Sequence, residues 1–181
     1  VFILPLWTLT MYAPQYPEGL TLDIYSYKLE GGNHNQDIKE INILNHYIGM
    51  RDLVEEDFTE FKWLPFVVGA LALLYLRAAV VGTAGHVLDV LVLNLYFSSF
   101  ALWSFAHRLY QYGHTLDPRA AVKVAPFMPP VFGSKQLANF TVFSYPGWAS
   151  WAMGISTALV MLAMLLSWRA SRANAAAPGT P

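Results

Sequence analysis

Two long stretches of this sequence are almost free of charge, and they restrict its fold more than any other feature. Residues 63–106 contain two charged side chains, Arg77 and Asp89, and residues 146–168 contain none. Backbone polar groups must be satisfied internally in hydrocarbon, so such runs predict membrane-spanning helices of about 20 residues each. Only 13% of the chain is charged, against roughly 25% in soluble domains. We therefore predict an integral membrane protein.

A polar turn at residues 82–86 divides the first stretch. Residues 63–110 are therefore expected to form a two-helix transmembrane hairpin, and residues 146–168 a third transmembrane helix. A hairpin returns the chain to the side from which it started. The two polar segments that flank it, residues 13–62 and 111–145, should then lie on the same side of the membrane.

The distribution of charges assigns the two sides. The tail, residues 169–181, carries Arg169 and Arg172 directly after the third helix and has no acid. Cytoplasmic flanks are enriched in arginine and lysine, so we expect a cytoplasmic tail and two periplasmic loops in a bacterial inner membrane. Lys123 and Lys135 in the second loop favour the opposite orientation.

The polar segments predict a small amount of local structure. The pattern of residues 21–29 indicates a short strand, GGNHN at 31–35 indicates a turn, and residues 36–50 indicate a helix that Gly49 could end. The apolar residues 1–12 are too few to cross a membrane alone, and we expect them to be the end of an N-terminal anchor that forms a fourth helix. The predicted fold class is an all-α membrane protein with two ordered periplasmic loops.

His46 and Met50, in the segment NHYIGM, are the candidate metal ligands. Residues four apart share one face of a helix, and imidazole and thioether ligands suit copper, especially Cu(I). His34 and Met128 lie in the two loops and could complete such a site. In the alternative interpretation, Gly49 ends the helix before Met50, which then fills a gap in the core.

Cofactor chemistry within the chain is restricted further. The absence of cysteine excludes disulfides, c-type haem attachment, iron–sulfur clusters and thiolate metal sites. His86 and His107 lie on one predicted helix about 30 Å apart, at ~1.5 Å per residue, and cannot ligate one haem iron. We predict no cofactor in this chain, and the net charge of −1 gives no indication of a nucleic-acid partner.

Arg77, His86 and Asp89 are the candidate polar residues within the predicted membrane segments. Ionisable groups at membrane depth are functional candidates. His86 could pair with Asp89 or with Arg77, either as a structural contact or as part of a proton relay.

Residues 126–147 are rich in aromatic residues and carry few charges. A rigid aromatic surface of this kind is typical of a protein interface, although it could equally lie on lipid as an interfacial belt. The predicted partner-binding residues come from this segment and from NHYIGM: Asn45, His46, Tyr47, Met50, Phe127, Pro129, Pro130, Phe132, Lys135, Gln136, Asn139 and Phe140.

Three segments, PQYPEGLTLDIY (14–25), EINILNHYIGM (40–50) and PPVFGSKQLANFTVFSYPG (129–147), resemble a family of small bacterial membrane proteins. Members of that family are encoded beside the clade II type of the copper enzyme nitrous-oxide reductase. The resemblance implies a periplasmic copper oxidoreductase as the partner, with the copper held by that partner, and membrane lipid around the helices.

These observations together predict a non-catalytic membrane subunit that docks nitrous-oxide reductase and anchors it near its electron donor. No nucleophile-and-base arrangement, phosphate loop or paired-carboxylate motif stands out in the sequence. Two alternatives stay open. One is a copper-delivery or maturation protein that uses His46 and Met50, and the other is a quinol- or proton-handling accessory subunit of a respiratory complex.

Overall fold

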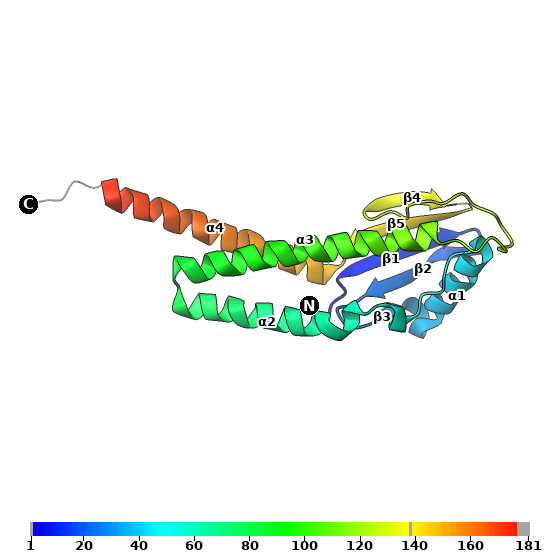
Figure 1. The fold of residues 1–181 in the computed structure, drawn as a ribbon, viewed down its shortest axis with the longest axis horizontal. Helices are drawn as coiled ribbons and strands as arrows, with labels where there is room; N and C mark the ends of the chain where they lie inside the picture. Colours follow the sequence, from blue (N-terminus) through cyan, green and yellow to red (C-terminus); the bar gives the residue numbers. More distant parts are fainter. Residues whose placement is uncertain (1, 138, 177–181) are drawn as a thin grey trace, which may run out of the picture.

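A five-stranded antiparallel sheet lies at one end of the molecule, and three long helices extend away from it (Figure 1). The structure is a computed structural model that describes residues 2–137 and 139–176. Its elements are β1 (Trp7–Ala13), β2 (Tyr16–Ile24), β3 (Leu29–Gly31), α1 (Gly32–Ile48), the short helix η1 (Glu55–Asp57), α2 (Glu60–Val81), α3 (Ala84–His114), β4 (Gly133–Leu137), β5 (Phe140–Pro146) and α4 (Trp148–Ala176). The predicted all-α fold class is therefore wrong, and the chain has a mixed α/β fold.

The three helices α2, α3 and α4 are long and apolar enough to cross a membrane. They match the helices predicted from the two uncharged stretches, although α3 and α4 extend further than expected. Gly82 adopts a left-handed conformation (φ +67°) directly after α2, and α3 begins at Ala84. Helices α2 and α3 thus form a hairpin, and its turn lies at the end of the molecule remote from the sheet (Figure 1). Of the predicted tail, residues 177–181 lie outside the described residues.

The first strand corrects the interpretation of residues 1–12 as the end of a membrane anchor. Trp7–Ala13 is the central strand of the sheet, whose order is β3-β2-β1-β5-β4. It pairs with β2 on one side and with β5 on the other. The ladder of a central strand satisfies both edges of the backbone, which a lone apolar segment at a membrane surface could not do.

Residues 111–145 also contain more structure than an extended loop. Their second half forms the hairpin of β4 and β5, which are paired from Gly133↔Ser144 to Leu137↔Phe140. The first half, residues 115–132, crosses from the end of α3 to the start of β4 without a helix or strand.

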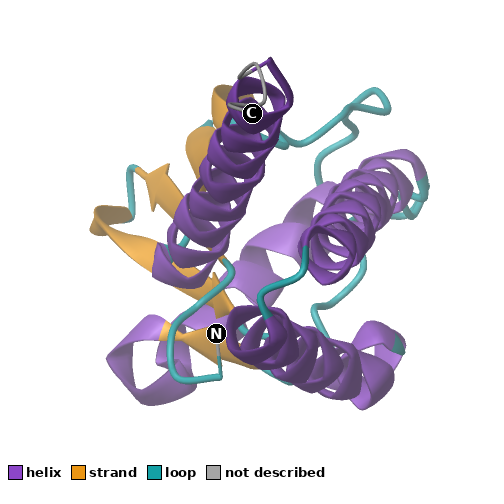
Figure 2. Cartoon of the chain, turned by 90° about the vertical axis from the view of Figure 1, so that its left-hand side faces the viewer, coloured by secondary structure: helices purple, strands orange, loops and turns teal. Residues whose placement is uncertain are grey.

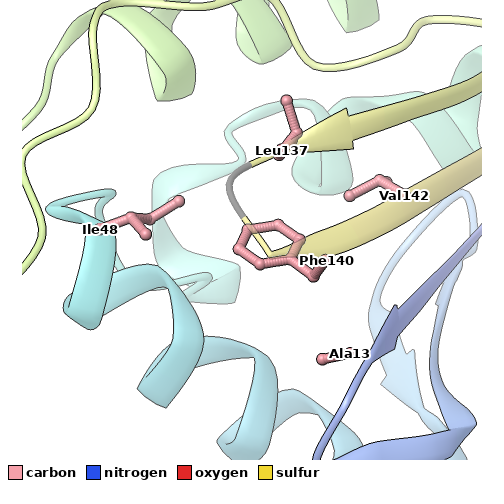
Figure 3. Close-up of a cluster of buried hydrophobic side chains, with 5 residues drawn as sticks. All are labelled: Ala13, Ile48, Leu137, Phe140 and Val142. Atoms are coloured by element: carbon pink, nitrogen blue, oxygen red, sulfur yellow. The ribbon is translucent and has the colours of Figure 1, made fainter.

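The hydrophobic core lies between the inner face of the sheet and α1. One cluster of buried side chains joins β2, β3 and α1: Leu20, Leu22, Leu29, Ile41 and Leu44. A second cluster joins the ends of β1, α1, β4 and β5: Ala13, Ile48, Leu137, Phe140 and Val142 (Figure 3). Ile41, Leu44 and Ile48 of α1 therefore face the sheet.

The start of α1 contains the predicted turn. Asn33, His34 and Asn35 have positive φ angles of 50°, 56° and 67°, a conformation in which asparagine and histidine are enriched among non-glycine residues. The buried carboxylate of Asp37 holds this turn against β2. It accepts hydrogen bonds from the Asn33 side chain at 2.9 Å and from the Thr21 N–H at 2.8 Å.

The connection between the sheet and α4 is very short. Gly147 alone separates β5 from α4, and its N–H donates to the Leu6 carbonyl at 2.9 Å, while the Ala149 N–H donates to the Pro5 carbonyl at 3.0 Å. The start of α4 is thus bonded to the residues that lead into β1. Viewed along the helices, α4 (marked by the C-terminus) has the sheet to one side (Figure 2), and it packs against α3.

Candidate functional site

The three segments that carry the family resemblance meet at one end of the sheet. Strand β1 runs from Trp7, beside the start of α4, to Ala13, and β5 runs back from Phe140 to α4. The end at Ala13 and Phe140 is therefore the end of the sheet remote from α4. We call this region the distal tip. It comprises the β1–β2 turn (14–15), the end of α1 (46–49), the β4–β5 turn at Asn139 and the loop 117–127.

The distal tip is built on the second core cluster. Figure 3 shows Ile48, at the end of α1, pointing toward Phe140 at the start of β5. Ile48 is 2% exposed and Phe140 is 3% exposed, and both belong to a cluster with Ala13 from β1. Tyr16 of the first segment packs against this cluster, so all three segments meet at it, and it positions the exposed residues around it.

A hydrogen bond joins the first two segments at their surface. The Tyr16 hydroxyl donates to a carboxylate oxygen of Glu40, and the Gln36 amide donates to the other oxygen at 3.1 Å. Donation from Tyr16, and then from Gln36, lowers the pKa of the Glu40 carboxyl. The same hydrogen bond to Glu40 is the main cause that raises the pKa of the Tyr16 hydroxyl.

This pair predicts a pH dependence of stability. Because the pKa of Glu40 is lower in the folded protein than its ordinary value of 4.5, its stabilising effect is present above that value and is lost as the pH falls through the folded pKa. We expect Tyr16→Phe to lower the midpoint of thermal unfolding at neutral pH and to have little effect in acid. Thermal unfolding of the detergent-solubilised protein across this range measures the difference, with Tyr12→Phe as the control. A Tyr16→Phe effect that stays constant into acid would contradict the assignment.

The loop 115–132 is bonded across the end of α1. The N–H of Asp117 donates to the Gly49 carbonyl at 2.8 Å, and the N–H of Val122 donates to the Tyr47 carbonyl at 3.1 Å. Gly49 has a left-handed conformation (φ +81°) and ends α1, as predicted. A Cβ atom at this position would lie 2.8 Å from the Asp117 carbonyl oxygen, so the loop approaches as closely as it does because residue 49 has no side chain.

The predicted partner-binding residues divide into two groups. Exposed residues of this set are His46, Tyr47, Phe132, Lys135, Gln136 and Asn139, whereas Asn45, Pro129, Pro130 and Phe140 are buried, and Met50 and Phe127 are half-buried. Of the residues that are not exposed, Phe140 belongs to the core cluster of the distal tip, and Met50 and Phe127 pack against it. The exposed group supplies side chains that a partner could contact. The two predicted segments are thus brought together, but only part of each reaches the surface.

The outer face of the sheet carries aromatic residues, of which only Phe132 is among the predicted partner-binding residues. The rings of Tyr12 and Phe143 meet edge to face at 5.6 Å, and those of Phe132 and Tyr145 at 5.4 Å. Tyr12, Phe143 and Tyr145 line a shallow hollow with Thr10 and Thr141. The alternation of threonine and aromatic residues in β1 and β5 was the available signal. We call this surface the outer aromatic face.

The candidate copper ligands lie in different surroundings. His46 is exposed at the end of α1, whereas Met50 follows Gly49, lines an interior cavity and packs against the core cluster of the tip. Within residues 2–137 and 139–176, no group of three or more His, Asp or Glu side chains is placed to hold a metal ion. The copper site at His46 and Met50 stays a prediction.

Two of the three predicted polar residues of the membrane segments, Arg77 and His86, meet near the α2–α3 turn. A guanidinium nitrogen of Arg77 lies 2.9 Å from Nε2 of His86, and the Thr83 hydroxyl contacts Nδ1 of the same ring. Of the two partners expected for His86, the structure therefore shows Arg77, whereas Asp89 is exposed. This cluster lies at the opposite end of the molecule from the distal tip.

A largely apolar cavity of about 470 Å³ lies between the inner face of the sheet and the long helices. Its charged lining residues, Glu60 and Arg108, form an ion pair at 3.1 Å, and the Ser104 hydroxyl donates to Glu60 at 3.0 Å. This ion pair was not predicted from the sequence. The available signal was an acid and a base that flank the two helices of the predicted hairpin on the same side.

Comparison of the chain with protein-family models, curated protein sequences and solved structures finds no match. The relationship to proteins encoded with nitrous-oxide reductase therefore stays a prediction from the three segments. What the structure adds is their position, because all three contribute to the distal tip.

Proposed function

We propose that this chain is a non-catalytic membrane subunit that docks a periplasmic copper oxidoreductase, nitrous-oxide reductase, and anchors it near its electron donor. In this proposal α2, α3 and α4 cross the bacterial inner membrane, and the sheet with α1 lies in the periplasm. The three apolar helices support a membrane location. Arg169 and Arg172, which follow the apolar part of α4, support a cytoplasmic position for that end.

The observation that carries the proposal is the convergence of three distant segments at the distal tip. Ile48 and Phe140 share one small core with Ala13, and Tyr16 packs against it. Exposed residues, including His46, Tyr47 and Asn139, surround this core. Core packing positions the exposed side chains before a partner arrives, which reduces the entropy lost on binding. The adjoining outer aromatic face adds Tyr12, Phe132 and Tyr145, and aromatic side chains are enriched in protein interfaces.

Affinity purification tests this proposal. The tagged full chain is purified from native membranes in mild detergent, and the proteins and copper that accompany it are quantified. We expect a copper oxidoreductase in near-stoichiometric amount. Tyr47→Ala should reduce it by about tenfold or more, because loss of an interfacial tyrosine commonly weakens binding by ~2 kcal/mol. Tyr27→Ala is the matched control, since Tyr47 is 51% exposed and Tyr27, which lies outside the tip, is 46% exposed.

The other outcomes point to other functions. If the chain purifies alone with bound copper, the copper-delivery alternative replaces docking. If no copper protein is captured, or if the two tyrosine variants lose it equally, docking through the distal tip is wrong. Loss of quinol-dependent turnover in Asp89→Asn, with the complex intact, would instead favour the quinol- or proton-handling alternative.

A further inference from the structure

We propose that the cavity between the sheet and the long helices holds an acyl chain of a membrane phospholipid. This inference rests on the membrane location in the proposed function, but not on the docking of a partner. It assigns a ligand to the interior of the protein, whereas docking concerns its outer surface.

The cavity extends from the membrane segments to the underside of the sheet. Leu64 and Val68 of α2, Ala101 of α3 and Met153 of α4 line one part, and Leu22 of β2 belongs to the part formed by the sheet. At about 470 Å³, it falls within the range of ~300–1,000 Å³ typical of ligand pockets. Atoms that line an empty apolar space lose their dispersion contacts, and water gains few hydrogen bonds there. A hydrocarbon chain restores those contacts.

The charged groups in the lining do not favour a polar ligand. Glu60 accepts hydrogen bonds from Nε and Nη2 of Arg108, at 3.3 and 3.1 Å, and from Ser104. The acid and the base therefore neutralise each other, and the Arg108 guanidinium also lies 5.8 Å from the Phe58 ring. The remaining lining is almost entirely aliphatic and aromatic, which suits an unsubstituted hydrocarbon chain better than a ring with several hydrogen-bonding groups.

The bilayer is the nearest source of such a chain. Helices α2 and α4 each pack against α3, and residues of all three helices line the partly open cavity. A lipid beside these helices can therefore insert one chain while its head group stays at the membrane surface. Phospholipid is the hydrocarbon-bearing molecule in greatest supply at that position, so we assign the occupant to it.

Two glycines in the membrane helices provide a matched test. A Cβ atom would meet no atom within 4 Å at either Gly154 or Gly69, but Gly154 lines the cavity and Gly69 does not. The full chain is purified in detergent and washed, and phospholipid, free fatty acid and isoprenoid quinone are extracted and quantified by mass spectrometry. We expect phospholipid to stay with the wild type and with Gly69→Phe. Gly154→Phe should lower it about tenfold, a change of ~1.4 kcal/mol in binding free energy.

Ala101→Phe is a second variant that fills the cavity from α3, and elution volume and thermal unfolding establish that each variant is folded. Folded Gly154→Phe and Ala101→Phe proteins that retain as much phospholipid as Gly69→Phe would overturn the proposal. Quinone or fatty acid in place of phospholipid would overturn it too, as would an empty wild-type protein. Because these measurements use the chain without a partner, lipid retention without capture of a copper enzyme would refute docking alone.

Discussion

Ile48→Ala is expected to destabilise the protein by about 2–5 kcal/mol, the usual range when a fully buried Ile is truncated. Ile48 is 2% exposed and contacts the core cluster that joins α1 to β1, β4 and β5. Its removal leaves a cavity at the point where the three segments of the distal tip meet. The midpoint of chemical unfolding in detergent, followed by tryptophan fluorescence, measures the loss.

Ile43→Ala is the matched control for this variant. Ile43 lies on the same helix but is 61% exposed, so its truncation should change the free energy of unfolding by no more than about 0.5 kcal/mol. Equal destabilisation by the two variants would show that α1 does not pack on the sheet through Ile48. If docking takes place at the distal tip, Ile48→Ala should also weaken capture of the partner, while Ile43→Ala leaves it unchanged.

Gly113→Ala is expected to destabilise the protein by about 1–3 kcal/mol, the usual effect of forcing an extra carbon into a packed site. Gly113 lies in the last turn of α3, and the Phe127 N–H donates to its carbonyl at 3.0 Å. A Cβ atom at this position would lie 2.0 Å from the Phe127 carbonyl oxygen and 2.9 Å from Cδ of Pro129. The loop 115–132 must therefore move away from α3. The part of this loop that crosses the end of α1 would move with it.

Gly113→Ala is expected to destabilise the protein, which is the opposite of the usual effect of this substitution within a helix. Alanine is a better helix former than glycine by about 1 kcal/mol, so a Gly→Ala change within a helix is normally neutral or stabilising. Gly69→Ala in α2, where a Cβ atom would meet no atom within 4 Å, should show that ordinary result. Thermal unfolding of both variants decides the matter, and a stabilised Gly113→Ala protein would contradict the packing of the loop against α3.

The helices were predictable because their signals are local. A sequence shows directly whether an apolar run is long enough to cross a bilayer. It also shows a glycine that follows a helical pattern. Neither signal requires knowledge of what lies nearby in space. Strand β1 was not recognised because it continues the apolar run of residues 1–7, and that run resembles the end of a membrane helix. Its partner β5 lies near the other end of the chain, and a single sequence gives no direct indication of that pairing.

The candidate site was predictable only in part, for the same reason. Asn45, His46 and Tyr47 are consecutive, yet the first is buried and the other two are exposed. Pro129 and Phe140 were expected at a partner surface, but they are buried by packing between segments far apart in sequence. Interfaces and cores favour the same aromatic and aliphatic residue types, so composition alone could not separate them. The interior cavity, formed by the sheet and all three long helices, had no local signal.

The single-residue junction at Gly147 makes the sheet and α4 one mechanical unit. A Cβ atom at Gly147 would lie 2.3 Å from the Pro5 carbonyl oxygen, so the junction has no room to act as a hinge. A strand of seven residues, at about 3.4 Å per residue, would hold the distal tip roughly 20 Å from the start of α4. In the proposed complex, the tilt of one membrane helix would then set the height and angle at which the partner stands above the lipid. A change in bilayer thickness that tilts α4 would rotate the sheet and the bound enzyme by the same angle.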